Sequence, residues 1–141
     1  MKAIELIHWE SEYSVGVAEI DAQHLDLINL INDMISLSTE TRAGAKKNFI
    51  EKCTLAGAHW FKHFETEENI LSKTTYEKFA DHKNEHENLT AKVVNLQNIL
   101  SSKEDVDLFS LIVSFKEWVL SHILLYDKEA KDFFKMGNKK L

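Results

Sequence analysis

Residues 82–100 read HKNEHENLTAKVVNLQNIL and carry two patterns at once. From Leu89 to Leu100, large apolar side chains recur three or four residues apart, which is the spacing of one face of an α-helix. His82 and His86 are also four residues apart and fall on that same face. The segment therefore predicts an amphipathic helix whose buried face carries two histidines one turn apart.

Three other segments show the same helical spacing. The first extends over 20–38, and the second follows a polar break at 39–42 and ends near Leu71. At 74–77 and 101–104, a Thr or Ser is followed three residues later by Glu, which predicts capping boxes that open the third and fourth helices. Because breaks of about four to six residues make consecutive helices antiparallel neighbours, the sequence predicts an all-α, up-down-up-down four-helix bundle.

The domain organisation follows from the same pattern. We expect a single domain over 1–141, in which 1–18 form an N-terminal arm packed over the bundle and 19–135 form the bundle itself. Asp21 or a neighbour is expected to cap the first helix, because Asp is a preferred residue at helix N-termini.

The composition excludes several classes of protein. The chain has 141 residues with a net charge of −6, four Gly and no Pro, which disfavours turn-rich β sandwiches and barrels. An acidic chain without a basic cluster predicts no nucleic-acid partner. No apolar run comes near the ~18 residues of a membrane span, and no signal-peptide pattern opens the chain, so we expect no membrane partner and a cytoplasmic location. The single cysteine, Cys53, allows no intrachain disulfide and suits that location.

Histidine is the unusual feature of the composition, with seven residues. A lone histidine on an apolar face is usually a core residue bonded to a backbone carbonyl, but here all four helices place histidine on their core faces. The side chains on these faces that could bind a metal are His24, His63, Glu67, His82, His86 and His122. Imidazole and carboxylate together suit Fe, Zn, Cu or Ni, and this set exceeds the four ligands of one structural zinc. The prediction is two metal ions bridged by carboxylate.

Two other metal-site patterns compete with this prediction. His82–His86 match the H-x-x-E-H pattern of inverzincin zinc peptidases, but that hypothesis leaves His24, His63, Glu67 and His122 unexplained and needs a cleft that a compact bundle of 141 residues hardly provides. Ferritin-like di-iron oxidases use Glu-x-x-His on two helices, and here the only such pattern is Glu5–His8 in the arm. An imidazole-rich set of neutral ligands stabilises the ferrous state, which favours reversible O2 binding over oxygenation.

These residues give the chain a resemblance to the hemerythrins, specifically to the bacterial single-domain branch. The matching pieces are Trp9, Tyr13, Val15–Val17, Ile20–Asp21, Gln23–His24, His63–Phe64, Glu67–Glu68, His82, His86, Trp118, His122–Ile123 and Asp127. The resemblance implies two non-haem iron ions joined by an oxo or hydroxo group, and reversible O2 binding for storage, delivery or sensing. An enzyme that scavenges peroxide or nitric oxide with the same ligands is the alternative.

The resemblance also assigns the ligands. One iron would be held by His82, His86 and His122, the other by His24 and His63, with Glu67 and Asp127 bridging and O2 binding at the second iron. Asp127 comes five residues after His122, about 140° away on a regular helix. It can reach the site only if the helix ends or bulges just after Leu125, as π-bulges do at functional sites.

Other positions carry smaller expectations. Trp118 and Val119 are expected to line the O2 pocket; the family commonly has leucine where this chain has Val119, which leaves the pocket roomier. Three roles are considered for His59: a hydrogen-bond donor behind the metal ligands, an alternative metal ligand, or a partly exposed histidine without a role in the site. The third is favoured. Glu68 is expected to face solvent. The sequence names no protein partner and leaves the oligomeric state open, with a monomer as one option.

Overall fold

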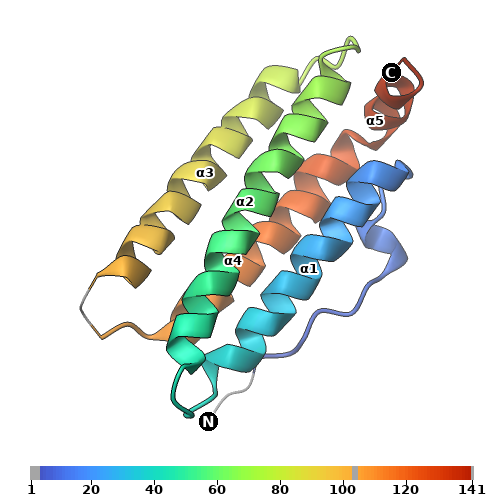
Figure 1. Cartoon of the computed structure of the whole chain (residues 1–141). Coiled ribbons are helices and arrows are strands. Elements are labelled where there is room, and N and C mark those ends of the chain that lie inside the picture. The colour runs from blue at the N-terminus through green and yellow to red at the C-terminus, as the bar shows by residue number, and fades with distance from the viewer. Residues whose placement is uncertain (1–3, 103–104, 141) are drawn as a thin grey trace.

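The computed structural model describes residues 4–102 and 105–140 and shows a bundle of helices. Its elements are the short 3-10 helix η1 (Ser11–Tyr13), α1 (Ala18–Ser38), α2 (Ala45–Leu71), α3 (Phe79–Ser101), α4 (Leu108–Ser121), the π-helical segment η2 (His122–Asp127) and α5 (Lys131–Asn138). The four long helices are aligned side by side (Figure 1), and the described residues contain no strand. The prediction of an all-α bundle is confirmed.

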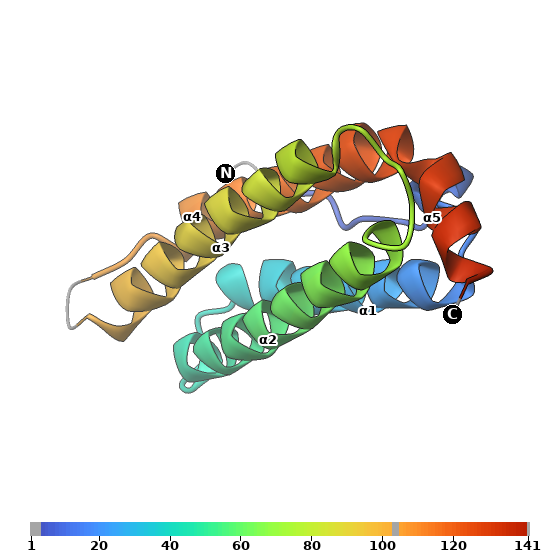
Figure 2. The same ribbon diagram turned by 90° about the horizontal axis from the view of Figure 1, so that it is seen from above.

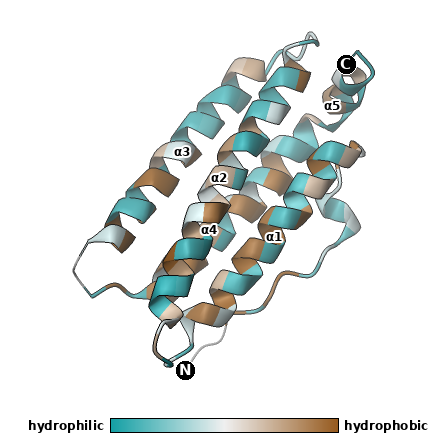
Figure 3. Ribbon diagram, viewed as in Figure 1, coloured by the Kyte–Doolittle hydropathy of each residue, from teal (hydrophilic) through white to brown (hydrophobic). Residues whose placement is uncertain are grey.

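The core lies between the long helices and extends to one end of the bundle. Hydrophobic and hydrophilic residues alternate along every long helix (Figure 3), as expected for helices with one buried face. Most buried side chains form one cluster, centred on residues such as Ile31, Phe49, Leu96 and Phe115. A second cluster closes the end at which α5 lies beside the start of α1 (Figure 2) and includes Phe134 of α5.

The arm is fastened to α1 by polar contacts. The backbone N–H of Ile7 donates to the side chain of Asn32 at 2.8 Å, and the Asn32 amide donates back to the Ile7 carbonyl at 2.8 Å. Asp21 does not cap α1, which begins at Ala18, inside the predicted arm. Its carboxylate instead accepts hydrogen bonds from the backbone N–H of Val15 and from the hydroxyl of Ser14. The side chain therefore binds the arm and not the first turn of the helix.

Both predicted capping boxes are wrong. Helix α3 begins at Phe79 without a side-chain cap, because the Thr74 hydroxyl donates back to Leu71 and ends the preceding turn. Helix α3 also runs on through Ser101, and Glu104 lies outside the described residues. The residue that caps α4 is Asp107, whose carboxylate accepts from the backbone of the first helical turn.

Helix α4 and η2 form one continuous helical stretch, Leu108–Asp127, which by length and composition alone could cross a membrane. The expectation that no segment reaches that length and apolarity is therefore wrong. Length and composition are shared by the core helices of globular proteins. In this structure 28% of the most apolar part of the stretch is buried, and Phe115, His122 and Asp127 face the interior of the bundle.

Candidate metal centre

Seven side chains that can bind a metal meet inside the bundle. His24 comes from α1, His63 and Glu67 from α2, His82 and His86 from α3, and His122 and Asp127 from η2. All seven are at most 2% exposed. The structure therefore brings together every residue that was predicted as a metal ligand.

The first group contains three histidines. Its members, whose candidate ligand atoms all lie within 4.8 Å of one another, are Glu67, His82, His86, His122 and Asp127. Oε1 of Glu67 lies 3.0 Å from Nε2 of His82 and 2.9 Å from Nε2 of His86. Oδ1 of Asp127 lies 3.0 Å from Nε2 of His122. These distances place one oxygen of each carboxylate among three imidazole nitrogens.

The second group contains two histidines and the other oxygen of each carboxylate. Nε2 of His63 lies 2.8 Å from Oε2 of Glu67, and Nε2 of His24 lies 3.0 Å from Oδ2 of Asp127. The two histidine nitrogens are 3.0 Å apart. Glu67 and Asp127 thus each turn one oxygen to each group, which is the arrangement of two bridging carboxylates.

The nitrogen and oxygen atoms of the site are arranged to bind metal ions and not to form hydrogen bonds with one another. Nδ1 of His24 donates to the backbone carbonyl of Tyr13, so in the neutral ring the lone pair of Nε2 points into the site, toward another nitrogen and a carboxylate oxygen. Oε2 of Glu67 and Oδ1 of Asp127 are buried without a hydrogen bond. Converging lone pairs and buried carboxylate oxygens need a positive partner, and a metal ion supplies one.

Asp127 reaches the site through the helical geometry of η2. A π-helical turn is wider than an α-helical one, so residues five apart, such as His122 and Asp127, return to one side. The prediction that Asp127 requires a bulge is confirmed, although the irregular turn begins at His122 rather than after Leu125. Glu85 of the H-x-x-E-H pattern belongs to neither group in the described chain, whereas His82 and His86 both join the group that holds Glu67, His122 and Asp127.

Comparison with known proteins now decides the family. The family model described as "Hemerythrin HHE cation binding domain" matches residues 15–134. The chain belongs to the hemerythrin family. The match spans the bundle and all seven buried side chains, so the family and the His/Glu/Asp cluster together indicate a metal site.

Individual hemerythrin relatives cover nearly the whole chain. A bacteriohemerythrin of Clostridium acetobutylicum is 28% identical over 127 residues, which are 88% of this chain and 98% of that protein. A bacteriohemerythrin of Stenotrophomonas maltophilia is 25% identical over 90% of this chain and 80% of its own length. The crystal structure of a wild-type hemerythrin superposes with a TM-score of 0.81 at 22% identity, covering 92% of this chain and 98% of that one. The last comparison shows the hemerythrin fold.

Aromatic rings surround the histidines of this hemerythrin site. The Phe64 ring stacks on His86, with centroids 4.0 Å apart and planes inclined by 13°, and buried Trp60 stacks on His63 at 5.9 Å. Trp118 is half-buried, packs against Phe115 and has Lys92 over its ring, and its lining of an O2 pocket stays a prediction. Sequence reasoning missed Trp60, although its position three residues before His63 was a usable signal.

Three further residues near the site had been assigned from sequence. Val119 is buried, one turn before His122, and its lining of an O2 pocket stays a prediction. His59 is exposed and stands in neither ligand group, as favoured. The expectation for Glu68 is wrong, because its carboxylate accepts a hydrogen bond of 2.9 Å from Nδ1 of His86, and its side chain is only 26% exposed.

The carboxylates dominate the electrostatics of the site. Burial lowers the pKa of His24, but the carboxylates of Asp127, at 3.0 Å, and Glu67, at 3.7 Å, outweigh it and raise this pKa to about 10. The same opposition raises the pKa of His82 to about 10 and that of His122 to about 9. Although burial raises the carboxyl pKa values, the surrounding histidines hold those of Glu67 and Asp127 well below their usual range. Without metal, the raised pKa values therefore favour the protonated forms of His24, His82 and His122 in the folded protein.

These shifts predict how the metal-free protein responds to pH. Histidines with raised pKa values stabilise the fold fully below their ordinary pKa near 6.5, and that contribution is lost as the pH rises through 9 and 10. We expect urea denaturation in the presence of a chelator to show lower stability at pH 10 than at pH 7. The lowered pKa values of Glu67 and Asp127 predict a second loss of stability at acid pH, as the pH falls below the usual carboxyl pKa near 4.

The metal-loaded protein provides the control for this prediction. Metal binding requires deprotonated imidazoles, so loading should reverse or flatten the loss between pH 7 and 10. Equal stability of the metal-free protein at the two pH values would contradict the predicted charge balance.

Proposed function

We propose that this chain binds O2 reversibly at a non-haem di-iron centre. The observation that carries the proposal is the sharing of Glu67 and Asp127 between two histidine groups, with one oxygen of each carboxylate facing each group. His82, His86 and His122 would hold one iron, and His24 and His63 the other. When bound, the iron pair supplies the two electrons that reversible O2 binding requires.

The unequal histidine count supports a place for a small ligand. The group with His24 and His63 offers four protein ligands, whereas the other group offers five. The position with fewer protein ligands keeps room for an exogenous molecule, as open metal sites do. All seven side chains are at most 2% exposed, so a molecule bound at this position must be small, which fits O2.

The protein supplies neutral donors at most of these positions. Five imidazoles and two carboxylates hold the site, so the ligand set carries little negative charge for two metal ions. Such ligands favour the reduced state and give little electron donation toward O–O cleavage, which supports O2 binding without oxygenation. The family names of the relatives agree with this reading and do not by themselves exclude an enzyme.

Iron analysis combined with visible spectroscopy tests the proposal. We expect about two iron ions per chain and an absorption band that appears under O2 and disappears under argon over repeated cycles. A band that bleaches irreversibly while peroxide or nitric oxide is consumed would favour the scavenging enzyme. A colourless protein that retains zinc would overturn both functions. We also propose that the protein is cytoplasmic and that its O2 binding serves storage, delivery or sensing.

Val119 offers a test of the O2 pocket. Replacing Val119 by leucine adds one methylene group beside His122 and should exclude water more completely, so we expect the oxygenated protein to oxidise more slowly in air. The rate is measured as the loss of the O2-dependent band over time. Val113→Leu makes the same change six residues earlier on α4, in a groove beside Ile4, and should leave the rate unchanged. Equal rates for Val119→Leu and the unmodified protein would remove Val119 from the pocket.

A further inference from the structure

Three of the five ligand histidines have a hydrogen-bond acceptor at the nitrogen that faces away from the site, and these acceptors differ in charge, whereas Nδ1 of His122 is buried without a partner. In the two-histidine group, Nδ1 of His24 donates to the Tyr13 carbonyl at 3.1 Å, and Nδ1 of His63 lies 2.7 Å from Oε1 of Gln23. Both acceptors are neutral. In the three-histidine group, Nδ1 of His86 donates to the carboxylate of Glu68 at 2.9 Å. The two metal positions therefore differ in the charge behind their ligands.

The orientation of Gln23 is set by its second contact. The Thr66 hydroxyl uses its only hydrogen to donate to the Lys62 carbonyl at 3.1 Å, so it can only accept from Gln23. The Gln23 group that faces Thr66, at 3.0 Å, must therefore be the amide NH2. This leaves Oε1 of Gln23 toward His63, which donates from Nδ1 and turns the lone pair of Nε2 into the site.

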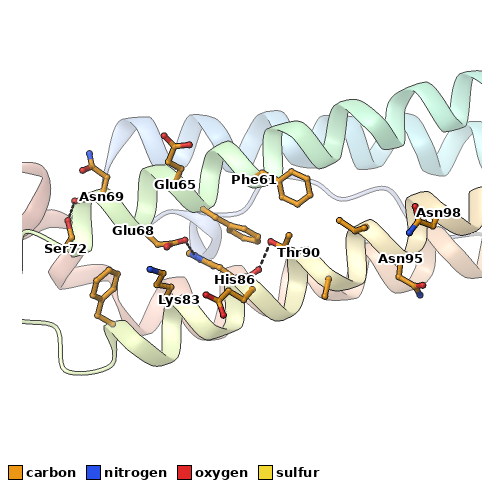
Figure 4. A pocket seen from close by; sticks show the side chains of 15 residues that line it. Phe61, Glu65, Glu68, Asn69, Ser72, Lys83, His86, Thr90, Asn95 and Asn98 are labelled. Atoms are coloured by element: carbon orange, nitrogen blue, oxygen red, sulfur yellow. Dashed lines mark hydrogen bonds and ion pairs between the residues drawn. The ribbon is translucent and has the colours of Figure 1, made fainter. Parts of the chain in front are cut away.

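Glu68 is held in place as well. It follows the bridging Glu67 on α2 and reaches across the groove between α2 and α3 to His86 (Figure 4). The Phe64 ring stacks on one face of the His86 imidazole, with ring centroids 4.0 Å apart. Nδ1 of His86 thus faces the Glu68 carboxylate, and Nε2 faces Oε1 of Glu67 in the metal site.

A carboxylate acceptor and an amide acceptor act differently on a ligand imidazole. A hydrogen bond to an anion is stronger than one to a neutral carbonyl and draws the N–H proton outward. This raises the basicity of the opposite nitrogen and strengthens its donation to a metal. A more basic ligand stabilises the higher oxidation state, because that state carries the larger positive charge.

We propose that Glu68 and Gln23 are positioning residues that make the two metal positions electronically unequal. The Glu68–His86 bond favours the oxidised state at the three-histidine position, and the Gln23–His63 bond favours the reduced state at the two-histidine position. The inference rests on the proposed di-iron centre. It adds that, after loss of one electron, the position with fewer protein ligands is the one that stays reduced.

Exchanging the two acceptors tests this inference. Glu68→Gln keeps an acceptor of the same shape without the charge and should raise the midpoint potential of the first oxidation of the iron-loaded protein. Gln23→Glu adds the charge behind His63 and should lower the potential of the second oxidation. A tenfold change in each equilibrium constant is expected, which is about 59 mV for one electron. Both variants should narrow the separation between the two potentials.

A spectroscopic measurement on a protein that cannot change oxidation state separates tuning from structural damage. In the zinc-loaded protein with labelled histidine, the Nδ1–H proton of His86 should resonate further downfield than that of His63. Glu68→Gln should move the His86 signal upfield and leave the His63 signal in place. The control is Glu65→Gln, the same change at an exposed position of α2, which should alter neither signal and neither potential.

The outcomes distinguish this inference from the proposed function. Unchanged potentials in both variants, at full iron content, would overturn the inference and leave the di-iron centre intact. The same holds if the His86 signal moves but the first potential does not. Failure of the unmodified chain to bind iron would instead overturn the proposed function.

Discussion

Replacing His63 by alanine is expected to lower the iron content of the purified protein from about two ions per chain to about one and to abolish O2 binding. His63 is one of only two histidines in its group, and its Nε2 lies 2.8 Å from Oε2 of Glu67. Its loss leaves three protein ligands at that position, whereas the group with three histidines keeps all of its own. Iron analysis and the difference spectrum between O2 and argon measure the two effects.

His59 provides the matched control for this variant. It lies one turn before His63 on the same helix, is exposed, and belongs to neither ligand group in the described chain. His59→Ala should keep full iron content and the O2-dependent spectrum. If His63→Ala also kept both, the assignment of the two-histidine position would be wrong.

Replacing Glu67 by glutamine should have the larger effect and remove both metal ions. Glu67 is fully buried, and its two oxygens are divided between the two groups, so one substitution weakens both positions at once. The neutral amide of glutamine also places an NH2 group at one of the two metal positions, and that group has no free lone pair with which to bind a metal. We expect iron content close to zero, which is a stronger result than the partial loss from His63→Ala.

The same substitution should also destabilise the metal-free protein. Glu67 lies among histidines whose pKa values it helps to raise, and removal of one partner from a buried charged network costs about 3 kcal/mol or more. Urea denaturation in chelator measures this loss. Glu65→Gln, two residues earlier and exposed, should change neither stability nor iron content. Full iron content in Glu67→Gln would contradict a bridging role.

The helices and the inward-facing histidines could be predicted from the sequence because helical periodicity is local. Neighbouring residues advance by about 100° each, so the spacing of His82, His86 and Leu89 already places them on one face. The same reasoning placed Glu67 one turn after His63. Asp127 could not be placed in this way, since its position depends on a π-helical turn, and only the family resemblance suggested it.

The helix ends were predicted less well because a capping side chain has competing partners. Asp21 has the right chemistry for a cap, but the backbone of the arm is close enough to use its carboxylate instead. At the start of α4, Asp107 caps the helix although the pattern pointed to Ser101. Which partner a short polar side chain takes depends on where distant segments of the chain lie.

Short stretches of the chain therefore determine which residues line the inner face of each helix. They do not determine which residues hydrogen-bond to the metal ligands from outside. Gln23 and His63 are forty positions apart in the sequence, and Glu68 and His86 are eighteen apart. Those contacts depend on how far each helix is rotated and shifted against its neighbour, which packing of the whole bundle decides. For this reason Glu68 was expected in solvent, whereas the tertiary structure places its charge directly behind a ligand.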